Sequence, residues 1–416
     1  MTRTLLATAA PLALALSPTL ASAQDDPFVL DEIVVTGAFT ALDPQPLSRT
    51  GATVDVLDGA DLQASPAFTL AGTLDTLPGV SFSANGGPGA VTTLRIRGLA
   101  PSYVGVRIDG IDVTDPSVVQ TFFDFGGLGR TGLGRVEVIK GSQSALYGSE
   151  AIAGVIDITT ARGEALGFSG RAQAEAGSFE TYSGALGLTQ RTERGQLSFN
   201  VDRTITDGIS ARAGDDEEDG YQQTFATLTG DYDVTDTLTL GFSALWRELD
   251  LEIDRSATDN SGETFSEQAG ARVFARLDAA GIRHELSYSA FSSDREDPGG
   301  FTREFLGDRR QLTYVGTGDI GANTLSFGAD WTEETIRTDD TSGEDVTVAL
   351  FGEAVLRPLE TLDMALSLRH DDSDDFGGVT TGRLALAWQA APDTIVRAVA
   401  GTGFRAPSLF ERFSGF

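Results

Sequence analysis

The sequence of 416 residues contains no cysteine and only two histidines. Disulfide bonds, thiol catalysis and cysteine metal sites are therefore excluded. The two histidines, His284 and His370, lie far apart, and neither has the spacing of a metal-ligand pair. No serine–histidine–aspartate arrangement stands out among the scattered acids. We therefore predict that the protein is not an enzyme.

Basic residues are scarce. Lysine and arginine total 30 against 61 aspartates and glutamates, which gives a formal net charge of −31, and Lys140 is the only lysine. Such a charge disfavours binding to nucleic acid and adhesion to anionic lipid surfaces. The length exceeds that of one ordinary small domain, so two or more folded units are expected.

A long hydrophobic run is also absent, since a membrane-spanning helix needs about 20 apolar residues. The longest apolar stretch, Leu5–Leu16, follows Arg3 and precedes the small residues Ala21-Ser22-Ala23. This order of a basic start, a short apolar run and a small-residue cleavage site is typical of a secretory signal peptide. Residues 1–23 are therefore predicted to direct export.

Residues 24–48 are polar and proline-containing, and we predict an extended segment apart from the heptapeptide DEIVVTG. Its members are Asp31, Glu32, Ile33, Val34, Val35, Thr36 and Gly37. A β-prone peptide on a tether can be bound as an added strand on the sheet of a partner. The alternative is an ordinary first strand of a domain, because short apolar runs are ambiguous.

Residues 49–160 predict a compact α+β domain with many turns. A helix is predicted over Thr69–Leu77, stopped by Pro78-Gly79. Short apolar strands are predicted at Val54–Leu57, Leu94–Ile96, Val104–Ile108, Val136–Ile139 and Val155–Ile158.

Residues 161–416 change to strand candidates of about ten residues in which apolar and polar side chains alternate. In Thr237–Trp246, for example, Leu240, Phe242 and Trp246 share the apolar face with Leu238 and Ala244. Short connections alternate with longer polar ones, such as 206–220 and 254–268. This pattern predicts an antiparallel transmembrane β-barrel; a soluble β-sandwich or β-solenoid is the alternative.

Three blocks identify a resemblance: TLAGTLDTLPGVSF (69–82), TTLRIRGLAPSYVGVRIDGIDVTDPS (92–117) and GRVEVIKGSQSALYGSEAIAGVIDITT (134–160). They closely resemble the plug domain of TonB-dependent outer-membrane receptors, in particular the cobalamin-receptor-like branch. DEIVVTG then resembles the TonB box of that family, and VRAVAGTGFRAPSLFERF (396–413) resembles a motif within its barrel.

The resemblance implies a receptor in the outer membrane of a Gram-negative bacterium. It would bind a scarce ligand, cobalamin, a ferric siderophore or a similar chelate, and import it with the TonB energy-transducing protein, which pairs with the TonB box. Its other partner is outer-membrane lipid, and none is nucleic acid. A ligand-sensing receptor and a non-functional or interaction-only remnant are the alternatives.

The resemblance also implies that Arg97 and Arg135 lock the plug to the barrel. A buried guanidinium needs carboxylate partners, and Glu137 or Glu353 could supply them. The alternative is that both arginines form ordinary salt bridges within the plug.

An acidic loop invites a calcium hypothesis, because clustered carboxylates suit a hard cation and cobalamin receptors of this family order such loops with calcium. Asp250 and Asp254 could join it. The alternative is a solvated charge run, since the spacing of a dedicated calcium loop is absent. The candidate ligands are Asp215, Asp216, Glu217, Glu218 and Asp219.

The predicted barrel is short. About 13 strand candidates follow the plug, whereas plugged transporters of this kind close at about 22 strands. An open sheet edge in lipid would leave backbone groups unsatisfied. We therefore expect a truncated or fragmentary receptor rather than a complete small barrel.

Overall fold

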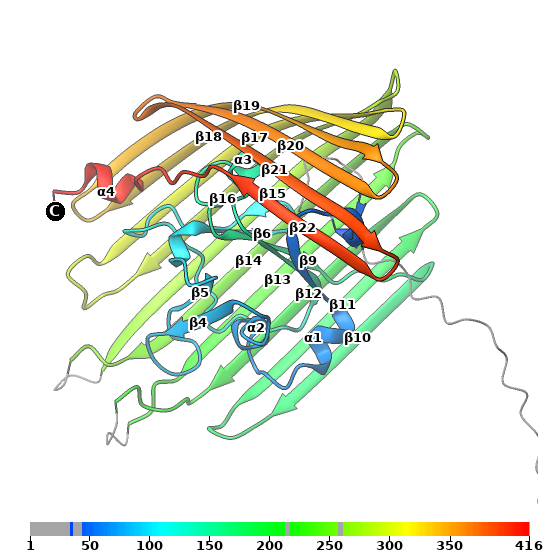
Figure 1. Ribbon diagram of the computed structural model, residues 1–416. Coiled ribbons are helices and arrows are strands. Elements are labelled where there is room, and N and C mark those ends of the chain that lie inside the picture. Colours follow the sequence, from blue (N-terminus) through cyan, green and yellow to red (C-terminus); the bar gives the residue numbers. More distant parts are fainter. Residues whose placement is uncertain (1–33, 36–43, 213–216, 257–260, 416) are drawn as a thin grey trace, which may run out of the picture. The chain divides into compact units, whose positions relative to one another are not determined.

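The computed structural model describes residues 34–35, 44–212, 217–256 and 261–415, all within the unit Ile33–Phe416. The predicted signal peptide lies outside the described residues, as does most of the heptapeptide. Two regions follow along the chain (Figure 1), a mixed domain of residues 44–160, here termed the plug, and a thirteen-stranded antiparallel sheet of residues 167–401, here termed the long sheet.

The plug contains short strands and short helices. Its main sheet has five strands in the order β3-β8-β9-β6-β7, in which only β6 and β9 run parallel, and β4 pairs with β5. Its elements are β3 (Thr53–Asp58), α1 (Gly59–Ala64), α2 (Leu70–Leu74), β4 (Val80–Ala84), β5 (Thr92–Ile96), η2 (Pro101–Tyr103), β6 (Val104–Ile108), β7 (Ile111–Asp112), β8 (Leu133–Lys140), α3 (Ser144–Tyr147) and β9 (Gly154–Thr160). Ahead of them lie β1 (Val34–Val35), β2 (Gln45–Pro46) and η1 (Leu47–Arg49).

The predicted helix over Thr69–Leu77 is shorter in the structure. Thr69 is the N-cap of α2, and its side chain accepts a hydrogen bond from the Gly72 amide. The helix ends at Leu74 because a residue before proline, here Leu77, avoids the helical region. Gly79 then turns the chain at a φ of +74°.

In the long sheet each strand pairs with its neighbours in sequence. Among the described residues, β10 and β22 pair on one side only. The strands are β10 (Gly167–Ala176), β11 (Tyr182–Thr192), β12 (Gly195–Thr206), β13 (Tyr221–Asp233), β14 (Leu238–Ile253), β15 (Gly262–Ala279), β16 (Ile282–Glu296), β17 (Glu304–Ile320), β18 (Asn323–Thr338), β19 (Ser342–Leu359), β20 (Leu362–Ser373), β21 (Gly377–Ala391) and β22 (Thr394–Gly401); a short helix, α4 (Leu409–Phe413), follows.

The connections alternate in length as the sequence predicts. One end of the sheet, here termed the short-turn end, carries turns such as 280–281, 321–322 and 360–361. The opposite end, the long-loop end, carries the connections 207–220 and 254–261. Several strands run to 16 or 18 residues, well beyond the expected ten, because polar residues continue the ladder past the apolar band.

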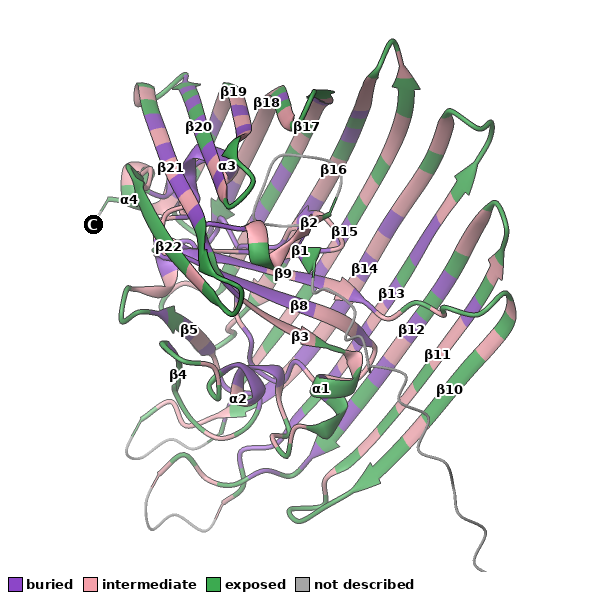
Figure 2. Cartoon of the chain, turned by 45° about the vertical axis from the view of Figure 1, so that its right-hand side comes forward, coloured by how far each residue is buried: buried purple, intermediate pink, exposed green. Residues whose placement is uncertain are grey.

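The two faces of the long sheet differ (Figure 2), since buried and exposed residues alternate along its strands. On β14, Leu240 points outward and is 47% exposed, whereas Ser243 is buried and donates a hydrogen bond to the Asp109 carbonyl of the plug at 3.0 Å. The predicted apolar face is therefore the outward one. The inward face is polar and packs against the plug.

The main core lies in the plug. Phe125, Leu94 and Ile156 are almost fully buried within it. The same cluster continues into the long sheet through Phe225, Leu245 and Phe291. Close backbone approach accompanies this packing, because a Cβ on Gly51 of the plug would lie 2.5 Å from the Leu386 nitrogen of β21.

Candidate functional site

The heptapeptide at 31–37 is described at Val34 and Val35 only; Asp31, Glu32, Ile33, Thr36 and Gly37 lie outside the described residues. Val34 and Val35 form β1 and pair antiparallel with Pro46 and Gln45 of β2. Val35 is fully buried and packs in a cluster with Val355 and Ala365 of the long sheet. The Arg135 guanidinium donates a hydrogen bond to the Val34 carbonyl. These two residues are thus docked as a short strand on the folded unit.

The four predicted lock residues occupy three places. On β8, Arg135 Nε donates to Glu137 Oε1 at 2.9 Å, a contact within the plug. Arg97 follows β5, and its guanidinium donates to Thr53 Oγ1 at 3.3 Å. Glu353 is buried on β19, where it accepts a hydrogen bond from Ser367 at 2.6 Å. A lock between plug and barrel made by these four residues stays a prediction.

Another arginine joins the plug to the long sheet by side-chain contacts. Arg309 of β17 is buried, and its Nη1 lies 2.9 Å from Asp112 Oδ1 and 2.9 Å from the Thr114 carbonyl of the plug. Its Nε donates to Glu334 of β18 at 2.7 Å. Burial alone would raise the pKa of Asp112, but the opposite charges of Arg309 and Arg107 hold that pKa below its ordinary value. Asp112 is therefore held as a carboxylate against the sheet.

Arg247 of β14 binds the plug backbone instead. Its guanidinium donates to the Asp124 carbonyl at 2.8 Å and to the Gly126 carbonyl. Gln223 and Gln268 on the neighbouring strands accept further hydrogen bonds from it. In both contacts the sheet supplies the cation and the plug supplies the acceptors, the reverse of the arrangement expected for Arg97 and Arg135.

A further ion pair lies toward the short-turn end. Arg49 of η1 reaches Asp363 of β20 at 2.9 Å, and Arg397 of β22 donates to the Thr50 carbonyl at 2.8 Å. The sequence offers a weak signal for such residues, because each sheet arginine named above occupies an ordinary position in the alternation. Only their distant partners distinguish them.

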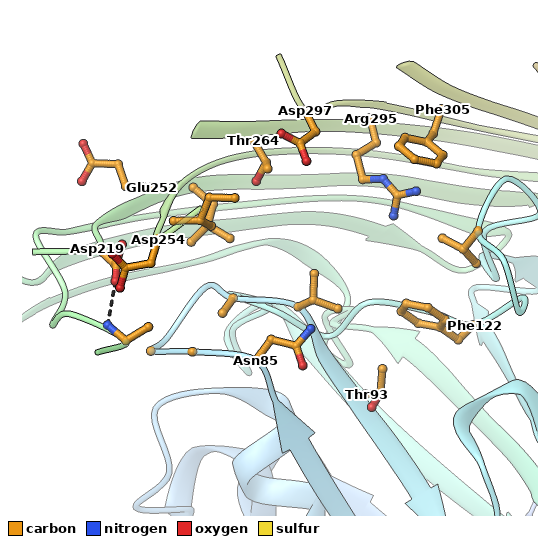
Figure 3. A pocket seen from close by; sticks show the side chains of 18 of the residues that line it. Asn85, Thr93, Phe122, Asp219, Glu252, Asp254, Thr264, Arg295, Asp297 and Phe305 are labelled. Atoms are coloured by element: carbon orange, nitrogen blue, oxygen red, sulfur yellow. Dashed lines mark hydrogen bonds between the residues drawn. The ribbon is translucent and has the colours of Figure 1, made fainter. Parts of the chain in front are cut away.

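A cavity of about 790 Å³ lies at the long-loop end, between plug loops and the ends of β14–β17 (Figure 3). Its plug wall includes residues 85–88, 90–91, 118–120 and 122, and its sheet wall includes residues 251–254. Apolar side chains such as Phe122 and Phe305 line it together with the charged Arg295. This cavity can enclose a ligand between the two regions of the chain.

The acidic loop borders this cavity. Asp215 and Asp216 lie outside the described residues. Carboxylate oxygens of Glu217, Asp219 and Asp254 lie within 4.8 Å of one another, and Glu218 lines an adjacent cavity. Asp219 already accepts a hydrogen bond from the Ala211 amide at 2.7 Å. Oxygen ligands in such a group suit calcium, and calcium binding here stays a prediction.

Buried charges bind the mixed plug to the polar face of an antiparallel sheet, and the other face of that sheet is apolar. This combination is typical of a plugged outer-membrane receptor. Residues 46–155 match the TonB-dependent Receptor Plug Domain, and residues 167–416 match the TonB dependent receptor-like, beta-barrel family. The chain belongs to the TonB-dependent receptor family. The family is one of outer-membrane receptors of Gram-negative bacteria and not of enzymes.

Curated relatives include the vitamin B12 transporter BtuB of Vibrio cholerae, 27% identical over 386 residues, which cover 89% of this chain and 62% of that protein. BtuB of Photobacterium profundum is 26% identical over 433 residues, covering 99% and 68%. The chain thus spans about 62% of the length of the first of these relatives.

Solved structures share the fold. The siderophore receptor PirA from Acinetobacter baumannii superposes with a TM-score of 0.73 at 15% identity, covering 86% of this chain and 62% of that one. The ferric enterobactin receptor PfeA from Pseudomonas aeruginosa, in complex with enterobactin, gives 0.70 at 19% identity, covering 87% and 64%. In the part of the chain that the structure describes, the helices are too short and too polar to cross a membrane.

Proposed function

We propose that this chain captures a scarce, large ligand at the outer surface and takes part in its import, driven by the TonB protein. The ligand class is cobalamin, a ferric siderophore or a similar chelate. The BtuB relatives carry vitamin B12 in their names, and the structural relatives include siderophore receptors. The BtuB relatives and the siderophore receptors both support a ligand that is cobalamin or a metal chelate of similar size.

One observation carries the proposal: the plug contributes to a different feature at each end of the long sheet. At the long-loop end its residues 85–88, 90–91, 118–120 and 122 wall the cavity of about 790 Å³. Toward the short-turn end, β2 and Arg135 of the plug contact β1, which packs beside Val355 and Ala365 of the long sheet. A ligand in the cavity therefore contacts the same folded domain that holds the tethered strand.

The tethered strand suits recognition by edge addition. Among the described residues two pairs join β1 to β2, and Pro46 has no amide hydrogen to donate. Residues 31–37 can thus exchange this short pairing for a longer ladder on the sheet of TonB. Arg135 and Val35 hold the strand until that exchange takes place.

The test uses the full chain in a TonB-proficient strain that lacks its own cobalamin receptor. Outer-membrane insertion is first checked by heat-modifiable migration and resistance to protease. Val34→Pro should reduce energy-dependent uptake of labelled cyanocobalamin or a ferric chelate at least tenfold, since proline removes a ladder donor, while binding to cells persists. Val34→Thr, which keeps β propensity, is the matched control.

Uptake that is unchanged in Val34→Pro, or that continues without TonB, would contradict the proposed role of the strand. A protein that remains periplasmic and is degraded would favour the remnant over the importer.

A further inference from the structure

The chain that follows β22 leaves the long sheet and lies against the plug. Strand β22 ends at Gly401, and residues 402–408 lead to α4, which packs beside β19 (Figure 1). Residues 402–413 are here termed the strap. The strap contacts the plug at several places, so it is another connection between plug and sheet besides the buried arginines.

Hydrogen bonds fix the first half of the strap. The Thr402 amide donates to the Gly382 carbonyl of β21 at 2.9 Å, and the Ser142 hydroxyl of the plug donates to the Thr402 carbonyl at 2.8 Å. Further along, the Ala406 amide donates to Ser149 Oγ of the plug at 2.9 Å. This half of the strap is therefore held by the sheet and by the plug together.

The second half of the strap is anchored to the sheet. The Arg412 guanidinium pairs with Asp375 Oδ2 at 2.5 Å, in the connection between β20 and β21 at the long-loop end. The Phe413 ring covers Gly343 of β19, and Leu409 is 2% exposed. Helix α4 thus has a defined position, from which its first residues can support a neighbouring segment.

That neighbouring segment is part of the cavity wall. The Ser408 hydroxyl donates to the Val119 carbonyl at 2.6 Å and, as the N-cap of α4, accepts from the Glu411 amide at 3.1 Å. The Glu411 carboxylate interacts with the side chain of Gln120. Val119 and Gln120 line the cavity of about 790 Å³, whereas Ser408 and Glu411 are not among its described lining residues. The strap therefore contacts this wall from behind.

Residues 118–122, here termed the wall loop, need such support. Its residues 118–121 belong to no helix or strand of the described chain, and Val119 is 53% exposed. The Asp115 amide donates to the Phe122 carbonyl at 3.0 Å, which closes the base of the loop. Between these two residues, side-chain contacts such as that of Ser408 supply the fixation that a backbone ladder supplies in a strand. Ser408 itself is 5% exposed, so water competes little for its hydroxyl.

We propose that Ser408 is a positioning residue for ligand binding, because it holds the wall loop where that loop lines the cavity. This inference rests on the proposed function, which places the ligand in this cavity. A wall loop that leaves its binding-competent position lowers the apparent affinity by the fraction of molecules in that position. One net hydrogen bond corresponds to a factor of about five in such an equilibrium.

The first experiment measures the mobility of the wall loop without a ligand. The chain contains no cysteine, so Val119→Cys provides a single attachment site for a nitroxide spin label on the full chain. We expect a restricted label when Ser408 is present and a more mobile one when Ser408→Ala is added. Ser408→Thr keeps the hydroxyl donor and should preserve the restricted spectrum.

Two further variants separate this role from the stability of α4. Ser408→Asp keeps an N-cap acceptor, but a carboxylate has no hydrogen to donate to the Val119 carbonyl, so this variant should behave as Ser408→Ala does. Ser142→Ala is the matched control. It removes another serine-to-carbonyl hydrogen bond between plug and strap, outside the described cavity lining, and should leave label mobility unchanged.

The second experiment measures binding of cyanocobalamin and of ferric enterobactin to the purified, unlabelled full chain by calorimetry. For a probe that binds the wild type, Ser408→Ala and Ser408→Asp should each raise the dissociation constant about fivefold. Ser408→Thr and Ser142→Ala should stay within about twofold of the wild type. The thermal unfolding midpoint should not follow this order, since positioning of the wall loop is local.

A label that is equally mobile with Ser408 and with Ser408→Ala would overturn the inference and leave the proposed function standing. Wild-type affinity in Ser408→Asp, with weakened binding in Ser408→Ala, would overturn it as well, because capping of α4 would then account for the loss. Failure of both probes to bind a correctly inserted wild-type chain would contradict the proposed function itself, and the inference would fall with it.

Discussion

The plug core and the inward face of the long sheet are equally buried but chemically opposite. Phe125 and Ile156 in the plug are 2% and 0% exposed, and Arg247 and Arg309 on the sheet are 3% and 7% exposed. The first pair is stabilised by apolar burial, which has no direction. The second depends on hydrogen bonds to a few plug atoms, which form at one position only. Apart from the apolar contacts of Phe225, Leu245 and Phe291, the plug is thus joined to the sheet by contacts of a different kind from those within its core.

Loss of plug packing should give the largest effect. Phe125→Ala removes a ring that stacks edge-to-face on Phe123 with centroids 4.7 Å apart, and we expect destabilisation of the plug by about 3–5 kcal/mol. Hydrogen exchange should then rise throughout β6, β8 and β9, with strands of the long sheet little changed. Phe125→Leu, which retains most of the volume, is the control. Exchange confined to the sheet contacts would contradict the separation of the two regions.

Loss of a buried contact arginine should act differently. Arg309 is buried, whereas Asp112 and Glu334 are partly exposed; Arg309→Gln removes the cation that both carboxylates contact, and we expect a loss of about 2–3 kcal/mol from these charged hydrogen bonds. Exchange should rise at β7 and β17, while β8 and β9 remain protected. Arg49→Gln is the control: Arg49 is more exposed than Arg309, and its partner Asp363 keeps a second arginine, Arg357, at 3.2 Å, so the change should cost less than about 1 kcal/mol. A rise of hydrogen exchange throughout the plug in Arg309→Gln would contradict the difference between the plug core and the contacts of the plug with the sheet.

The smallest effect concerns pH. Asp157 of β9 lines a cavity of about 600 Å³ between plug and sheet, and burial together with the negative charge of Glu137 raises its pKa to about 6, against the opposing charge of Arg107. The folded state therefore holds a proton that the unfolded state, with a pKa near 3.8, releases. Stability should fall between pH 4 and pH 6 by about 2 kcal/mol as pH rises.

Asp157→Asn should flatten this decline in a series of thermal unfolding midpoints, since the amide does not titrate. Asp319→Asn, in a strand at the sheet surface, should leave the decline unchanged. If stability still falls with rising pH in Asp157→Asn, groups other than Asp157 cause the decline.

Local patterns predicted the fold well where side chains alternate. The strand at Val104–Ile108 matches β6 residue for residue, and about 13 strands were expected after the plug, where the described residues of the long sheet form 13. The short helices α1 and α3 were missed, because six or four residues carry too little periodicity. Strand ends were placed too early, since polar residues extend the ladder beyond the apolar band.

The sites were harder to predict because their contacts are distant in sequence. Asp112 and Arg309 are separated by 197 positions, and neither stands in a recognisable motif. The acidic loop was identified from its charge, and of the two acids expected to join it Asp254 lies with Glu217 and Asp219, whereas Asp250 accepts a hydrogen bond from Gln222. Residue types alone therefore suggest which chemistry is present, and the fold decides which groups meet.

The register of β1 on β2 has a mechanical consequence. Val34, where the described strand begins, pairs with Pro46, the residue from which the chain continues into η1 and the plug. A pull that enters ahead of Val34 is therefore resisted at the same end of this antiparallel pair. Force in that direction separates the two pairs one after the other, as in a zipper, rather than loading both at once in shear. The pairing with β2 therefore resists such a pull weakly, and the hydrogen bond from Arg135 and the burial of Val35 are the further contacts that release of the strand must break.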